Sequence, residues 1–126
     1  MTDIISKILK QEPDLCAWGL ADDYLRRRNG VSCKSPIDPE EFQVCLTWLS
    51  LCQVRKTVNP GIGSSYGLKH RVEHWSGRYV TNGAFIAAVI HLGIPFKRYP
   101  DSPNIHLALS GKGLPTPGVW RGSCRG

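Results

Sequence analysis

The chain has 126 residues, of which 41% are hydrophobic and 21% are charged, and this balance is typical of one soluble globular domain rather than a disordered chain. The longest apolar run, AFIAAVI, is too short to cross a bilayer, and the N-terminus lacks the basic segment of a signal peptide, so we expect a cytoplasmic protein without membrane contact. The formal net charge of +6 is uneven, because residues 1–41 hold six Lys and Arg against eight acids and residues 42–126 hold ten against two.

Hydrophobic spacing predicts two helices before residue 31. Residues 3–11 place four aliphatic side chains on one face, which indicates a short amphipathic helix. A second helix is expected to begin at Pro13, a favoured first helical position, and to end at Asn29–Gly30. Its last turn would hold Arg26–Arg28, where cations favour the negative end of the helix dipole. This structural role competes with phosphate binding as an explanation of the three arginines.

Three further helices are predicted in the middle of the chain. The first spans 39–56, with Asp38 as its N-cap. The second begins at Ser64 or Ser65 and stops at Gly77. The third spans 82–92 and is apolar almost all round, which is typical of a buried helix.

The last elements complete the predicted fold. The stretch FKRYPDSPNIHLALS alternates as two strands around a turn and predicts a β-hairpin, whereas residues 111–126 are rich in Gly and Pro and are expected to be a flexible tail. We therefore expect one α+β domain over 1–110, with four to five helices around the buried central helix 82–92 and a C-terminal β-hairpin. Three helices before a hairpin also suit a winged helix, but the third helix has only Asn82 and His91 as polar side chains for reading bases.

The five cysteines are odd in number and include no C-x-x-C pair, which argues against a disulfide framework or a four-cysteine zinc site. Cys45 and Cys52 lie seven residues apart, on one face of the predicted 39–56 helix. We expect the cysteines to be buried free thiols that act as small hydrophobic side chains.

His70, Glu73 and His74 have the H-x-x-E-H spacing of the inverzincin metalloproteases, in which two helical histidines bind zinc. Those enzymes take their third ligand from a downstream glutamate, and this chain has no glutamate after Glu73. A zinc-dependent hydrolase is therefore the third hypothesis, and we expect no metal, no cofactor and no catalytic residue. No cysteine and histidine lie in a local signature of a nucleophilic enzyme either.

Cations and aromatic residues alternate in the second half of the chain, which favours phosphate contacts and base stacking. The predicted binding residues are Lys69, His70, Arg71, Arg78, Tyr79, Lys97, Arg98 and Tyr99. The competing explanation is that the cations only solvate the surface while some of the aromatic residues belong to the core. We expect nucleic acid, most simply DNA, or an acidic surface of a nucleic-acid-handling host protein as the partner.

Residues 64–110 contain SYGLKH, YVTNGAFIAA and SPN in order. This stretch resembles a core shared by small proteins of unassigned chemistry that are carried by phages, prophages and plasmids. The resemblance implies a mobile-element setting, and it adds nothing for residues 1–63. The leading hypothesis is a non-catalytic protein that binds DNA through the basic and aromatic residues. The alternative is a phage-type inhibitor that binds a host defence complex, for example a CRISPR–Cas effector.

Overall fold

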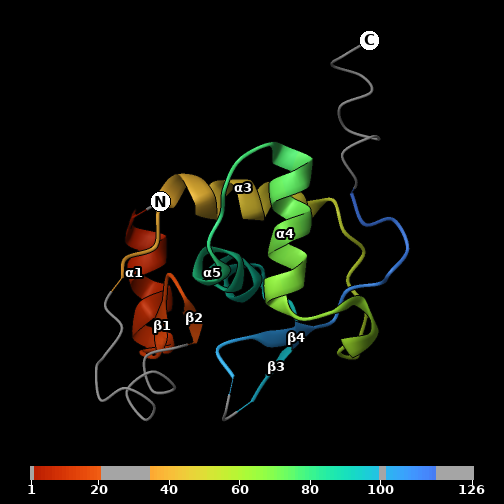
Figure 1. The fold of residues 1–126 in the computed structure, drawn as a ribbon. Helices are drawn as coiled ribbons and strands as arrows, with labels where there is room; N and C mark the ends of the chain where they lie inside the picture. The colour runs from red at the N-terminus through yellow and green to blue at the C-terminus, as the bar shows by residue number, and fades with distance from the viewer. Residues whose placement is uncertain (1, 21–34, 100–101, 116–126) are drawn as a thin grey trace.

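The computed structural model describes residues 2–20, 35–99 and 102–115, and the statements below concern these residues. They form a small α+β fold with four α-helices and two small antiparallel sheets (Figure 1). Among these residues, none of the helices has the length and apolar content that a bilayer crossing needs.

Capping residues mark several of the helix ends. They are α1 (Thr2–Gln11), α3 (Pro39–Ser50), α4 (Ser65–Ser76) and α5 (Asn82–Leu92), with a short 3-10 turn at Pro60–Ile62. Asp38 caps α3 by accepting a hydrogen bond from the Glu40 amide, and Thr81 caps α5 by accepting one from the Ala84 amide. The last two helices each end at a left-handed glycine, which satisfies free carbonyl groups at the helix end.

Two hairpins complete the fold. Strands β1 (Leu15–Cys16) and β2 (Gly19–Leu20) pair through a tight turn at Ala17–Trp18. Strands β3 (Phe96–Arg98) and β4 (Ile105–Leu107) form the C-terminal hairpin that the sequence predicts. In their register Lys97 lies opposite His106.

Helix α5 contributes many residues to the core. Every residue from Asn82 to Val89 is buried, and α1, α3, α4 and the β1–β2 hairpin all pack against this helix. Figure 1 shows α5 end-on, with α3 above it, α4 to its right and the β3–β4 hairpin below. Trp48 from α3 lies against Phe85, with ring centroids 6.1 Å apart. Leu114 also packs against this core, so the first residues after 110 contact the domain.

Two predicted helices differ from the structure. The helix expected from Pro13 is wrong over Leu15–Leu20, which form the β1–β2 hairpin instead, and the rest of that prediction, including the three arginines, lies outside the described residues. The 39–56 helix ends at Ser50, because Val54 pairs with Leu109 and the Arg55 amide donates to the Ala108 carbonyl. Hydrogen bonds with residues 108–110, directly after β4, thus replace helical ones from residue 53 onward.

The cysteine prediction is correct for two residues and wrong for a third. Cys45 is a buried free thiol, and Cys52 is a half-buried free thiol. Burial raises the pKa of Cys52 to about 12 and raises that of Cys45 further, so neither thiol is a ready nucleophile at neutral pH. Cys16, in contrast, is disulfide-bonded. Spacing along the sequence gave no sign of this bond, and its partner lies outside the described residues. The cytoplasmic location stays a prediction that the disulfide does not favour.

Candidate nucleic-acid interface

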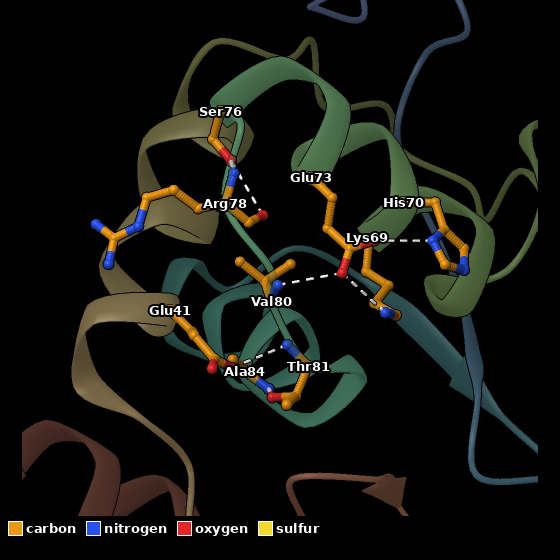
Figure 2. A network of polar contacts seen from close by, with 9 residues as sticks. All are labelled: Glu41, Lys69, His70, Glu73, Ser76, Arg78, Val80, Thr81 and Ala84. Carbon is orange, nitrogen blue, oxygen red and sulfur yellow. Dashed lines mark hydrogen bonds and ion pairs between the residues drawn. The ribbon is translucent and has the colours of Figure 1, made fainter.

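Two residues of the H-x-x-E-H motif, His70 and Glu73, form a hydrogen-bonded cluster with Lys69 and the Val80 amide, which we call the Glu73 network (Figure 2). Glu73 accepts hydrogen bonds from Lys69 Nζ at 3.1 Å and from the Val80 amide at 3.2 Å. His70 Nδ1 lies 2.8 Å from the other carboxylate oxygen. The spacing of three and four residues puts these side chains on one face of the helix.

The pKa of Glu73 follows from these contacts. Burial alone would raise it, but hydrogen bonds from Lys69, the Val80 amide and His70 lower it below its usual value. Among the described residues, no group of three or more His, Cys, Asp or Glu side chains could hold a metal ion. Glu73 accepts hydrogen bonds both from α4 and from the chain that follows it.

That following chain, residues 78–81, is the connector between α4 and α5. Its Thr81 amide donates to Glu41 Oε1 of α3 at 2.9 Å, directly after the Val80 amide that donates to Glu73. Figure 2 shows the two carboxylates facing successive amides of the connector. Two helices therefore fix the backbone on the C-terminal side of Tyr79, whose side chain is 65% exposed.

Three of the predicted cations have carboxylate partners within the protein. Lys69 is only 6% exposed and is paired with Glu73. Arg78 pairs with Glu40 at 2.8 Å. Arg98 pairs with both Glu12 and Asp14 at 3.0 Å, and so joins β3 to the start of the β1–β2 hairpin. These ion pairs lower the positive charge that the surface presents to a partner.

Two predicted cations have no ion pair within the described part of the chain. Arg71 is exposed on α4, and Lys97 is exposed on β3. Lys97 Nζ lies 5.5 Å from the Tyr99 ring centroid, and the Tyr99 hydroxyl is hydrogen-bonded to His106 Nδ1 at 2.6 Å. His106 lies between buried Ile105 and Leu107, so its side chain and those of Lys97 and Tyr99 share the solvent side of the hairpin. We call Lys97, Tyr99 and His106 the hairpin outer face.

A second surface carries exposed aromatic rings. Tyr66 of α4 and Tyr79 of the connector both lie against Lys69, whose Nζ is 5.4 and 4.9 Å from their ring centroids. Tyr66 also meets His70 edge to face at 4.7 Å. Tyr79 lines a hollow together with Trp18 of the β1–β2 turn. We call Trp18, Tyr66 and Tyr79 the aromatic strip; their side chains are 63%, 53% and 65% exposed.

The two surfaces are linked through the start of β4. The Ile105 amide donates to the Ser65 hydroxyl of α4, and Asn104 accepts from Asn82, which also donates to the Trp18 carbonyl. Lys69, His70 and Tyr79 lie at the aromatic strip, and Lys97 and Tyr99 lie on the hairpin outer face. Arg78 and Arg98 instead pair with carboxylates of other elements. The set of predicted binding residues left out Trp18, Tyr66 and His106.

Comparisons with family models, curated proteins and solved structures find no match to this chain.

Proposed function

We propose that this protein is a non-catalytic nucleic-acid-binding protein that holds DNA on the aromatic strip and the hairpin outer face. The observation that carries the proposal is the exposure of three large aromatic rings in a chain of net charge +6. Large rings are normally buried, and an exposed group of them marks a binding surface. Aromatic rings stack on bases and nearby cations contact phosphates, so this combination suits nucleic acid.

The phosphate contacts are assigned to the cations that the fold leaves unpaired. Lys97 and Arg71 are exposed and lack a carboxylate partner within the described residues. Arg55 and Lys56 add two exposed cations at the opposite edge of β4 from β3. In contrast, Lys69 packs against the rings of Tyr66 and Tyr79, so it would influence binding by positioning those rings.

The winged-helix arrangement stays a prediction, and the proposed function does not use it. A recognition helix needs polar side chains that reach base edges. The helix in that place, α5, has eight consecutive buried residues from Asn82 to Val89. Contacts from the strip and the hairpin would favour binding without strong sequence preference.

Anisotropy titrations of labelled DNA at two salt concentrations test the proposal. Lys97→Ala and Arg71→Ala should each weaken binding on every sequence and reduce the slope of log affinity against log salt by about one. Lys7→Ala is the matched control, because it removes the same charge from an exposed position on α1. Equal affinity of all three variants and the wild type would exclude Lys97 and Arg71 as the phosphate contacts, and a wild-type protein that does not bind DNA would remove nucleic acid as the partner.

A protein partner is the second candidate function, and the ion pairs of Lys69, Arg78 and Arg98 favour it. They neutralise three of the five cations predicted for phosphate binding, and they leave exposed Trp and Tyr side chains of the kind that dominate protein interfaces. In that case the protein would be an inhibitor that docks on a host defence complex. Purified protein that fails to bind DNA, yet binds one host complex through Tyr79 and Trp18, would support this candidate.

A further inference from the structure

The hollow at the end of the aromatic strip is small and open, with a cavity volume of about 80 Å³. It lies between the β1–β2 turn and the connector. Its lining residues are Ala17, Trp18, Ser35, Tyr79 and Thr81. Pockets for drug-sized ligands span roughly 300–1,000 Å³. The hollow is several times smaller than that, so it can partly enclose one flat ring but not a whole drug-sized ligand.

The Trp18 wall is held by tight backbone packing. Asn82 Nδ2 donates to the Trp18 carbonyl at 3.2 Å, and the Gly83 amide donates to the Ala17 carbonyl at 2.9 Å. A Cβ atom at Gly83 would lie 1.8 Å from the Cys16 carbonyl oxygen, so the turn sits directly on the first turn of α5. The Ala17 amide donates to the Ser35 carbonyl, which fixes the third side of the hollow.

The Tyr79 wall is fixed from the opposite side. Glu73 and Glu41 hold the next two amides of the connector, and Lys69 lies against the Tyr79 ring. Both aromatic walls are therefore anchored through their backbones, whereas their rings stay exposed. A ring that enters the hollow would meet two surfaces that are already in place.

The remaining lining residues include two with hydroxyl groups, which can form hydrogen bonds with the edge of a base. The Thr81 hydroxyl accepts from the Ala84 amide, which leaves its hydrogen free to donate. The Ser35 hydroxyl makes no hydrogen bond within the described part of the chain, and Ser35 is half-buried. Single-stranded nucleic acids are recognised by aromatic stacking of splayed bases together with hydrogen bonds to base edges.

We propose that the hollow between Trp18 and Tyr79 holds one unpaired nucleobase, and that the protein therefore prefers single-stranded nucleic acid to a duplex. This inference rests on the proposed function. A base within a duplex is stacked and paired, and bringing it to the hollow would cost a few kcal/mol for unstacking. The chain's positive charge favours a base attached to phosphates over a neutral aromatic side chain of a protein.

Three DNA ligands test this inference: a dT dodecamer, a dodecamer of abasic sites with the same phosphates, and a duplex dodecamer. Tryptophan emission is measured on the Trp120→Phe background, in which Trp18 is the one exposed indole while Trp48 and Trp75 are buried. The dT dodecamer should quench this emission. It should also bind about tenfold more tightly than the abasic dodecamer, since one stacked base contributes on the order of 1–3 kcal/mol.

Substitutions of Trp18 and Tyr79 test whether the preference for the dT dodecamer comes from the two walls of the hollow. Trp18→Ala and Tyr79→Ala should each lower the affinity for the dT dodecamer by about tenfold and leave the affinity for the abasic dodecamer unchanged. Trp18→Phe keeps a ring in the wall and should retain most of the affinity. Circular dichroism melting checks each fold, and if Trp18→Ala does not fold, Tyr79→Ala and Trp18→Phe decide the outcome.

The outcomes separate this inference from the proposed function. Equal binding of the dT and abasic dodecamers, with a loss on Lys97→Ala, would overturn the base site and leave nucleic-acid binding standing. Binding to none of the three ligands would overturn both, and would direct attention to a protein side chain as the occupant of the hollow. Preference for the duplex would also overturn the base site.

Discussion

The Glu73 network and the β1–β2 turn hold neighbouring parts of the same surface in different ways. The network is polar: one carboxylate collects Lys69, His70 and the Val80 amide. The turn is held by backbone contact: Gly83 lies so close to Cys16 that no side chain fits between them. The Glu73 network depends on charge and hydrogen bonds, whereas the β1–β2 turn depends on Gly83 having no Cβ atom.

The two regions also differ in how far apart their contacting residues lie in the sequence. The network is local, with partners three and four residues apart on a helix, so spacing alone brings them together. The turn depends on contacts across more than 60 residues, such as that of Asn82 with Trp18. The two regions should also respond differently to substitution, acid and salt.

The largest effect is expected for Gly83→Ala. The added methyl group would meet the Cys16 backbone at 1.8 Å, and backbone on both sides cannot move aside easily. We expect a loss of about 3 kcal/mol in the free energy of unfolding, at the upper end of overpacking effects. Gly67→Ala is the matched control: nothing lies within 4 Å of its added methyl group on α4, so it should stabilise by up to about 1 kcal/mol. Urea unfolding measures both. A Gly83→Ala variant as stable as the wild type would show that the turn is not seated on α5.

A smaller loss, about 2 kcal/mol, is expected for Glu73→Ala. This substitution leaves Lys69 without its carboxylate partner at 6% exposure and leaves the Val80 amide without its acceptor. Glu40→Ala breaks the pair with Arg78, in which both side chains are more than half exposed, and should cost less than about 1 kcal/mol. Thermal melting compares the two variants, and equal losses would mean that the Glu73 network is no more than a surface contact.

The smallest effect is a pH dependence of folding stability, which we expect from the Glu73 network and not from the β1–β2 turn. The pKa of Glu73 is lowered in the folded state, so its ionised form contributes stability above the unfolded pKa, near 4.5. That contribution is lost as the pH falls below 4.5 and through the folded pKa. The wild type should therefore lose stability in acid more steeply than Glu73→Gln, whereas Gly83→Ala should keep the wild-type slope. Melting between pH 7 and pH 3 measures this, and parallel curves for the wild type and Glu73→Gln would contradict it.

Much of the helical architecture could be predicted because its signals are local. Thr81 and Gly93 bound α5, and Gly77 ends α4, where capping rules place those ends. The C-terminal hairpin followed from alternation in β3 and β4. The β1–β2 hairpin did not, because two-residue strands carry too little alternation to compete with a helical interpretation of the residues after Pro13.

The sequence was enough to predict which residue types form the candidate site, but not how much positive charge the site presents. The sequence placed Lys97, Tyr99 and Tyr79 among the binding residues, and all three lie on the two surfaces. It could not show that Arg98 meets Glu12 and Asp14, which are more than 80 residues away, or that Arg78 meets Glu40. A count of cations therefore overstates the positive surface whenever distant carboxylates pair with them.

The connector between α4 and α5 has a consequence for the thermodynamics of binding. An exposed tyrosine on a free loop would lose backbone entropy when a ligand orders it, at roughly 1–2 kcal/mol per residue. Here the two amides after Tyr79 are already held by Glu73 and Glu41. Most of that entropy is lost when the protein folds, not when it binds. A ligand on Tyr79 would therefore face a smaller ordering cost than exposure of the side chain alone suggests.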